Sequence, residues 1–262
     1  RWRCLSGFGK CLKVLFSTFA MVLCADISRL NFGVLSLIPK VPGADHIRLF
    51  RPIALINVPF KICAKACSNR MSSIAHRIIS RTQSAFIRGR NILEGSLVLQ
   101  EIVHSLKRAR QPVILLKLDF EKAYDRLNWE FLRQVLLDPR FSSVWVHRMM
   151  QLVSGGQTAI AVNGEVGNFF RNKRGLRQGD PASPLLFNFV ADALGAMLDR
   201  AHLAGHIRGV ADNLIPGGVS HLQYADDTLL LFEPDTHSIA SVKAILLCFE
   251  LMSGLKINFH QK

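Results

Sequence analysis

The sequence predicts an α+β fold in which an antiparallel sheet is backed by helices. Short apolar runs typical of strands, such as residues 113–118 and 219–224, alternate with longer segments of helical periodicity. Acidic residues stand where two of these runs end. Hydrophobic residues make up 49% of the 262 positions, which is ample for a core.

Residues 1–110 are predicted to be mainly helical, with one strand pair at residues 34–38 and 52–57. An apolar run at residues 14–25 is shorter than the roughly 20 residues of a bilayer span, so we expect a buried helix there. A helix beginning at Pro59 places Cys63 and Cys67 on one face with Phe60. The six cysteines show no zinc spacing, which favours reduced thiols in an intracellular protein.

Residues 91–106 have the pattern of an amphipathic helix, and a basic turn then leads into the second half of the chain. The β-favouring run at residues 113–118 predicts a buried strand that carries Asp119 at its end. Residues 219–224 and 228–232 predict a β-hairpin with Asp226 and Asp227 at its tip. Further helices are expected at residues 129–136 and 144–153, and another hairpin at residues 159–171.

These three carboxylates have the pattern of a two-metal site. Carboxylates on two rigid sheet elements can hold two Mg²⁺ ions roughly 3.5 to 4 Å apart, as an in-line displacement at phosphorus requires. Magnesium prefers such hard oxygen ligands and keeps substrate phosphates in its shell. The alternative is that the Asp-Asp pair is ordinary turn chemistry on a solvated loop.

A glycine-rich segment at residues 174–187 lies between the two acidic clusters. Its glycines allow the backbone to approach a ligand closely, and Ser183 followed by Pro184 is typical of a helix start. The helix that follows is predicted to place its apolar residues on one face, against a sheet. Those residues are Leu185, Leu186, Phe189, Val190, Ala193, Leu194, Met197 and Leu198.

Three segments resemble motifs A, B and C of reverse transcriptases, most closely those of plant LINE-type (non-LTR) retrotransposons. They are Asp-Phe-Glu-Lys-Ala-Tyr-Asp at residues 119–125, Arg-Gly-Leu-Arg-Gln-Gly-Asp-Pro-Ala-Ser-Pro at residues 174–184, and Tyr-Ala-Asp-Asp at residues 224–227. Further blocks in the family's order occur at residues 37–40, 50–55, 83–90 and 254–258.

The resemblance implies a right-hand polymerase, with fingers and an N-terminal extension at residues 1–110 and a palm at residues 111–262. It implies an RNA-directed DNA polymerase that transfers dNTPs to a primer 3′-hydroxyl on an RNA template. The catalytic acids would be Asp119, Asp226 and, less directly, Asp227, which with the carbonyl of Phe120 would bind two Mg²⁺ ions, for which Mn²⁺ could substitute.

The resemblance also implies substrate-binding residues. Tyr124 matches the aromatic steric gate that favours deoxynucleotides, and Gln178 and Gly179 match the loop that lines the nucleotide and template pocket. Arg51 and Lys40 match residues that neutralise the incoming triphosphate, a task suited to the bidentate geometry of arginine. Lys262 matches a lysine that could protonate pyrophosphate. The chain departs from the family pattern at Arg88, Ala182 and residues 137–141, but at no metal ligand.

The distribution of charge independently favours a polyanionic partner. Residues 1–118 carry 19 Lys and Arg against 4 Asp and Glu, whereas residues 119–262 carry 14 against 15. A surface this basic binds phosphate backbone without reading sequence, and its affinity falls as salt rises. The alternative is a basic surface that only aids solubility.

Relatives in this family carry an endonuclease upstream and a thumb downstream, and we expect both to be missing from this chain. The expected partners are an RNA template, a DNA primer and dNTPs. Without a thumb, the chain would grip the primer and template poorly. The alternative function is therefore a catalytically inactive truncated remnant that only binds nucleic acid. An intron-encoded maturase or a telomerase relative is a further alternative. No membrane association is expected, and nuclear localisation follows from the family alone.

Overall fold

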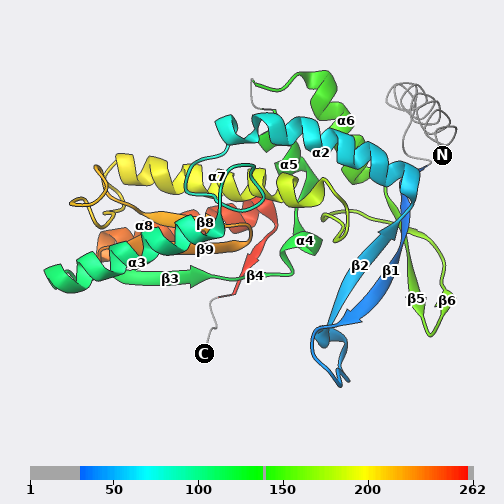
Figure 1. Ribbon diagram of the computed structural model, residues 1–262, viewed down its shortest axis with the longest axis horizontal. Helices are drawn as coiled ribbons and strands as arrows, with labels where there is room; N and C mark the ends of the chain where they lie inside the picture. Colours follow the sequence, from blue (N-terminus) through cyan, green and yellow to red (C-terminus); the bar gives the residue numbers. More distant parts are fainter. Residues whose placement is uncertain (1–29, 138–139, 259–262) are drawn as a thin grey trace, which may run out of the picture.

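The computed structural model describes residues 30–137 and 140–258, which form a mixed α+β fold (Figure 1). This confirms the predicted fold class. The expected helix at residues 14–25, the cysteines at positions 4, 11 and 24, and Lys262 lie outside the described residues.

The first sheet is built on a long hairpin that projects from one side of the molecule (Figure 1). Strand β1 (Phe32–Pro39) pairs antiparallel with β2 (Phe50–Ile56), and the 3-10 helix η2 (Ile47–Leu49) lies in their connection. Strand β5 (Gln157–Val162) joins β1 in parallel, and the short strands β6 (Glu165–Val166) and β7 (Phe170–Arg171) pair with β5. This sheet therefore contains strands from both sides of residue 110. The division into two domains at residue 110 remains a prediction.

The second sheet is the antiparallel sheet predicted for the palm. Its strand order is β3 (Ile114–Leu118), β9 (Asp227–Phe232) and β8 (His221–Tyr224). The prediction that residues 113–118 form a buried strand is wrong for one face, because Leu115 is 50% exposed and Lys117 also faces solvent. Of the three strands, β3 pairs only with β9, so it has an open edge as well as an open face.

A third, two-stranded sheet follows directly after Asp119. Strand β4 (Phe120–Glu121) pairs antiparallel with β10 (Lys256–Ile257), and the Asn258 N–H donates to the Asp119 carbonyl at 2.8 Å. Phe120 packs its ring against Phe249 of helix α8 (Thr236–Ser253), with ring centroids 6.2 Å apart. The Phe120 side chain is thus part of the core, and any role at the site would rest on its carbonyl.

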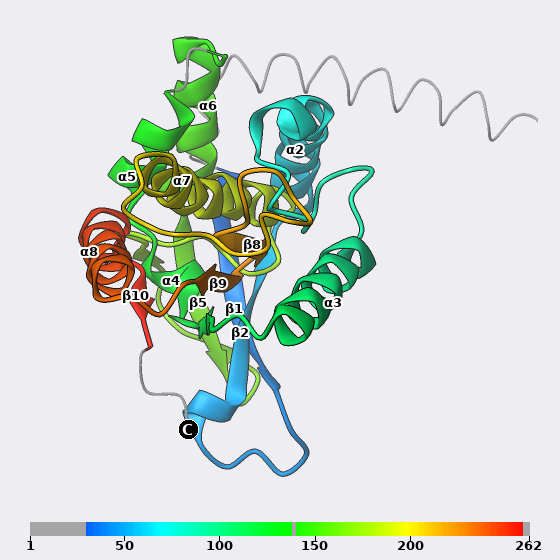
Figure 2. The same cartoon turned by 90° about the vertical axis from the view of Figure 1, so that its left-hand side faces the viewer.

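Helices cover one side of the palm sheet (Figure 2). Helix α7 (Ser183–Leu203) lies over β8, with α8 beside it and α5 (Trp129–Leu136) and α6 (Ser143–Ser154) beyond. The prediction of a single apolar face on α7 is incomplete. Phe187, Asn188 and Ala191 are also buried, because the first half of α7 is enclosed on several sides.

Helix α2 (Val58–Ile78) starts one residue before the predicted Pro59, because the Asn57 side chain accepts a hydrogen bond from the Phe60 N–H at 2.9 Å. Cys63 and Cys67 are free thiols buried in its inner face, as predicted, and burial raises the pKa of both. Helix α3 (Ile92–Ala109) packs against β8 on the other side of the palm sheet. Its residues Ile102 and Leu106 form a second small core cluster.

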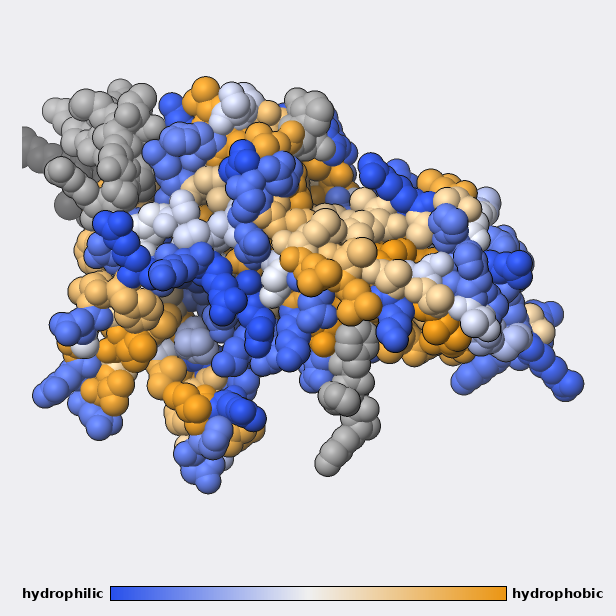
Figure 3. Space-filling view, turned by 180° about the vertical axis from the view of Figure 1, so that it is seen from behind, coloured by the Kyte–Doolittle hydropathy of each residue, from blue (hydrophilic) through white to orange (hydrophobic). Residues whose placement is uncertain are grey.

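Helix α8 is long and apolar enough by length and composition to pass a test for a membrane span, with 28% of its residues buried. Its inner side packs Val242, Leu246 and Phe249 into the core. Its outer side exposes apolar residues, and apolar side chains gather on the face shown in Figure 3. The expectation of no membrane association remains a prediction.

Candidate active site

The structure brings the three predicted carboxylates to one end of the palm sheet. Leu118 at the end of β3 pairs with Thr228 of β9, so Asp119 continues the register opposite Asp227. Tyr224 pairs with Asp227, which leaves Ala225 and Asp226 as a two-residue turn. Ala225 adopts the left-handed conformation, with φ of +55°, and its side chain is buried. All three acids are exposed at this edge.

Lys117 lies on β3 two residues before Asp119, and its charge interacts with all three acids. Lys117 Nζ lies 2.9 Å from Asp227 Oδ1. Its pKa is raised first by the hydrogen bond to Asp227, then by the charge of Asp227, and further by Asp119 and Asp226. The strand register gives the same arrangement, because Asp119 follows Leu118 opposite Asp227, and Asp226 precedes Asp227 in the turn. The three acids therefore lie at the same end of the sheet, whereas their role in metal binding stays a prediction.

The donor set suits magnesium in chemistry, but it is not a preformed cage. Within residues 30–137 and 140–258 no group of three or more His, Cys, Asp or Glu side chains is close enough to hold a metal ion together. Asp227 is engaged by Lys117 instead. Magnesium usually takes only one or two carboxylates and completes its shell with water and substrate phosphates, so Asp119 and Asp226 can supply the protein's share.

Tyr124 stands next to these acids on the short helix α4 (Ala123–Arg126). Its ring stacks on Phe187 of α7, with centroids 5.2 Å apart and planes inclined by 17°. Burial, and secondly the negative charge of Asp226, raise the pKa of Tyr124 to about 12. The phenol therefore stays protonated, and its ring is held against Phe187.

The glycine-rich loop is clamped to the segment that carries Tyr124. The Leu176 N–H donates to the Tyr124 carbonyl at 2.6 Å, and the Gly175 N–H donates to the Leu127 carbonyl at 2.8 Å. Trp129 Nε1 donates to the Gly175 carbonyl at 2.7 Å. Gly175 has φ of +86°, and a Cβ there would lie 2.7 Å from the Asp125 carbonyl oxygen. Only glycine fits this close approach.

The same loop reaches the first sheet through Gln178 and Gly179. The Ala54 N–H of β2 donates to the Gln178 carbonyl at 2.7 Å. Gly179 has φ of +104°, and a Cβ there would meet the Ala54 carbonyl oxygen at 2.9 Å. Gln178 and Gly179 thus join the β1–β2 hairpin to the palm, and their role in lining a nucleotide pocket stays a prediction.

A buried ion pair stiffens the start of this connection. The Arg177 guanidinium lies 3.9 Å from Asp180 and 4.9 Å from the Phe60 ring centroid. Burial is the main influence on both partners, lowering the pKa of Arg177 and raising that of Asp180. Asp180 also accepts a hydrogen bond from the Ala182 N–H at 2.8 Å, which fixes the entry into α7.

Comparison with known proteins identifies the family. Residues 38–261 match the family model described as "Reverse transcriptase (RNA-dependent DNA polymerase)". The chain belongs to the reverse transcriptase family. This match covers the acids at the sheet edge, the glycine-rich loop and β2, and it confirms the resemblance to reverse transcriptases found in the sequence.

Several relatives of this reverse transcriptase chain come from retrotransposons. A 149 kDa protein of transposon TX1 from Xenopus laevis is 29% identical over 76% of this chain and 15% of its own length. A Pol polyprotein of the retrotransposable element R2 from Nasonia vitripennis is 29% identical over 80% of this chain and 19% of its own. The chain thus spans less than a fifth of these relatives. The predicted affinity to plants stays a prediction, although an uncharacterized mitochondrial protein of Arabidopsis thaliana is 37% identical over 26% of the chain.

Solved structures support the same fold. Telomerase from Candida tropicalis, in complex with a fragment of telomeric RNA, has a TM-score of 0.61 with this chain at 13% identity. The match covers 87% of this chain and 40% of that one. At this identity the likeness concerns the fold alone.

Two predicted substrate-binding residues of this reverse transcriptase lie on the β1–β2 hairpin, apart from the acids. Lys40 is near the far end of the hairpin, where its Nζ donates to the Arg48 carbonyl at 3.1 Å. Arg51 is exposed on β2, in register with Ile38. No hydrogen bond or ion pair joins either residue to the acids within the described part of the chain, so their role stays a prediction.

Sequence reasoning missed three residues that shape the reverse transcriptase site: Lys117, Trp129 and Gln83. Lys117 could have been noticed, because a lysine two positions before Asp119 in an apolar strand faces the same side as the acid. Gln83 belongs to a block recognised by resemblance, but nothing in its residue type indicates a partner. That partner, the backbone of Ala225, is visible only in the fold.

Proposed function

We propose that this chain is the catalytic core of an RNA-directed DNA polymerase, which joins a deoxynucleoside triphosphate to the 3′-hydroxyl of a DNA primer on an RNA template. The observation that supports it best is the meeting of Asp119 and Asp226, from separate elements, at an exposed edge of the palm sheet. An exposed edge leaves room for the reacting strand ends.

Asp119 and Asp226, with the Phe120 carbonyl and a less direct contribution from Asp227, would hold two Mg²⁺ ions, or Mn²⁺ in their place. When bound, such ions lower the pKa of the attacking hydroxyl and stabilise charge on the leaving oxygens. The residues of the chain arrange the reactants. Lys117 neutralises Asp227, and the Tyr124 ring limits the space beside Asp226.

The triphosphate would be bound by residues outside the acidic edge. Arg51 is exposed on β2 and can offer a bidentate fork to phosphate, whereas Lys40 offers a point charge farther along the hairpin. Gln178 and Gly179 hold β2 to the loop beside Tyr124, so they set the distance between the hairpin and the acids.

Primer extension on an RNA template tests the proposal. Asp226→Asn keeps the size of the side chain and removes the charge, so incorporation of dNTPs should fall by at least about 100-fold, the order expected for lost metal coordination. Asp212→Asn, a change at an exposed residue of the palm outside this edge, is the control and should leave the rate unchanged. Equal activity of the wild-type chain and Asp226→Asn would refute the proposal.

The second candidate function is a nucleic-acid-binding remnant without polymerase activity. The observation that favours it is the engagement of Asp227 by Lys117, which leaves two free acids at the edge. The basic half of the chain would still bind RNA in a salt-dependent manner. RNA binding without incorporation, even when a thumb segment is supplied, would decide for this candidate.

Residence in the nucleus is proposed from the kinship with retrotransposon proteins, as is an association with endonuclease and thumb segments. Imaging of a fluorescently tagged chain in cells tests the location. A cytoplasmic signal that persists when nuclear export is blocked would argue against it.

A further inference from the structure

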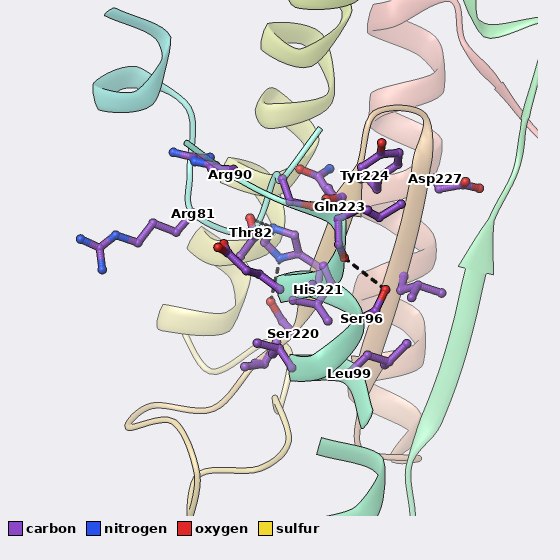
Figure 4. Close-up of a pocket in the computed structure, with 18 of the residues that line it drawn as sticks. Arg81, Thr82, Arg90, Ser96, Leu99, Ser220, His221, Gln223, Tyr224 and Asp227 are labelled. Carbon is purple, nitrogen blue, oxygen red and sulfur yellow. Dashed lines mark hydrogen bonds between the residues drawn. The ribbon is translucent and has the colours of Figure 1, made fainter. Parts of the chain in front are cut away.

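The connection between α2 and α3 adds a short extra strand to the palm sheet. The Ser84 N–H donates to the Gln223 carbonyl at 3.0 Å, and the Gln223 N–H donates to the Thr82 carbonyl at 2.9 Å. These bonds form a parallel bridge between Gln83 and Gln223 on the outer edge of β8. Figure 4 shows Thr82 lying beside this strand, with Gln223 and Tyr224 leading to the hairpin tip.

The Gln83 side chain bonds directly to the turn that carries Asp226. Gln83 is fully buried, and its Oε1 accepts hydrogen bonds from the Ala225 N–H at 2.9 Å and the Ala85 N–H at 3.0 Å. Its Nε2 donates to the Ala225 carbonyl at 3.4 Å. One amide side chain therefore binds both polar groups of the Ala225 backbone.

Ala225 needs such a partner for two reasons. Its left-handed φ of +55° costs an alanine roughly 1 kcal/mol or more relative to the ordinary region. It is also buried, so its N–H would have no other partner if the Gln83 oxygen were removed. Asp226 is the next residue, so the direction of its carboxylate depends on the dihedral angles of Ala225.

Gln83 is itself held in place from two sides. The Arg90 guanidinium donates to the Gln83 carbonyl at 2.5 Å and to the Ile79 carbonyl at 2.8 Å, which ties the segment to the end of α2. Asn188 of α7 donates from Nδ2 to the Ala85 carbonyl. Asn188 therefore anchors the same segment as Gln83, and among the described residues it forms no hydrogen bond with the Ala225–Asp226 turn.

We propose that Gln83 is a positioning residue for polymerisation, which fixes the Ala225–Asp226 turn so that the Asp226 carboxylate faces Asp119. The Gln83 amide takes no part in the chemistry and acts only through the backbone of Ala225. The catalytic half of this inference rests on the proposed function, whereas the structural half concerns the turn alone.

Hydrogen exchange of the metal-free chain tests the structural half. Gln83→Met keeps the length of the side chain and removes both hydrogen bonds to Ala225, so amide exchange in a peptide covering residues 224–227 should accelerate at least about tenfold. Asn188→Leu is the matched control, because it removes an anchor of the same segment and should leave exchange in that peptide within about twofold. If Gln83→Met does not fold, Gln83→Asn replaces it, since its amide stops one methylene short of the turn.

Primer extension with the same variants tests the catalytic half. Gln83→Met should lower kcat at least about tenfold and raise the Mg²⁺ concentration for half-maximal activity, with little change in the KM for dNTP. Unchanged exchange at the turn, equal acceleration in Asn188→Leu, or wild-type kinetics in Gln83→Met would each overturn the inference. If the wild-type chain extends no primer, the proposed function fails, while the exchange experiment still decides whether Gln83 holds the turn.

Discussion

At the scale of single residues, the position of Tyr124 is fixed by its contacts. Its ring is fixed by Phe187 on one side, and its main-chain carbonyl is bound by the glycine-rich loop. A ring held this firmly can discriminate by shape, because moving it aside would break the stacking and the burial that raises its pKa. The steric-gate role implied by the family is therefore physically reasonable for this residue.

Replacing Tyr124 by Val should relax sugar selectivity. A smaller side chain leaves room for a 2′-hydroxyl, so incorporation of ribonucleotides relative to deoxynucleotides should rise at least about tenfold, corresponding to roughly 1.4 kcal/mol. Tyr124→Phe keeps the ring and should retain the selectivity of the wild-type chain. The measurement is competitive primer extension with each nucleotide type. A ratio that is the same in all three proteins would contradict the gate.

His221 makes folding stability depend on pH. The imidazole is almost fully buried, with Nε2 3.0 Å from Thr82 Oγ1 and Nδ1 3.1 Å from Ser220 Oγ (Figure 4). Burial lowers its pKa below the usual 6.5, an effect that Asp199 at 3.6 Å partly opposes. In the interval between the folded pKa and 6.5 the unfolded chain binds the extra proton, so the free energy of unfolding should fall as the pH falls through that interval.

Urea unfolding between about pH 7.5 and pH 5.5 measures this effect. His221→Asn removes the titrating group, so its stability should fall less steeply with acid than that of the wild-type chain. Parallel pH profiles for the two proteins would show that burial of His221 has no influence on its protonation.

At the scale of elements, the glycine-rich loop is where local backbone and site geometry are most tightly linked. It bonds to α4 through Leu176 and to β2 through Gln178, so one segment sets the relation between palm and hairpin. The sequence indicated that backbone approached something closely here, but it could not show that the partner was the protein's own chain.

Alanine substitutions at two glycines separate the cost of a left-handed backbone from the cost of a steric clash. Gly175 and Gly164 have almost the same φ, +86° and +85°, but a Cβ meets backbone at 2.7 Å at Gly175 and nothing within 4 Å at Gly164. Gly164→Ala should therefore cost only the left-handed penalty of roughly 1 to 2 kcal/mol, measured by urea unfolding. Gly175→Ala should cost clearly more and lower polymerase activity, because α4 and the loop must separate. Equal costs would mean that the loop adjusts freely.

Elements with strong local signals were predicted well. Helix α5 was predicted at residues 129–136 as observed, and the β8–β9 hairpin was predicted from two short apolar segments separated by a few residues. The parallel pairing of β5 with β1 was not predicted, because it joins segments far apart in sequence and parallel pairs leave no turn signal. The exposure of β3 was missed because an apolar run does not reveal whether both faces are covered.

At the scale of the whole molecule, the position of the three acids at one sheet edge could be predicted because their motifs are local, whereas the residues around them could not. Lys117 reaches Asp227, and Gln83 reaches the Ala225 backbone beside Asp226, only after the sheet has formed. The placement of Arg51 and Lys40 relative to the acids depends on how the hairpin stands against the palm, which is a property of tertiary structure. Sequence reasoning thus identifies reactive groups better than the framework that orients them.

The pairing of β4 with β10 has a consequence for synthesis on the ribosome. Asn258 donates its N–H to the carbonyl of Asp119, and Ile257 pairs with Phe120. Until this late stretch has left the exit tunnel, the segment around Asp119 lacks its neighbouring strand. The nascent polypeptide therefore gains these contacts around Asp119 only after residues 256–258 have been translated, although Asp119 itself emerges far earlier.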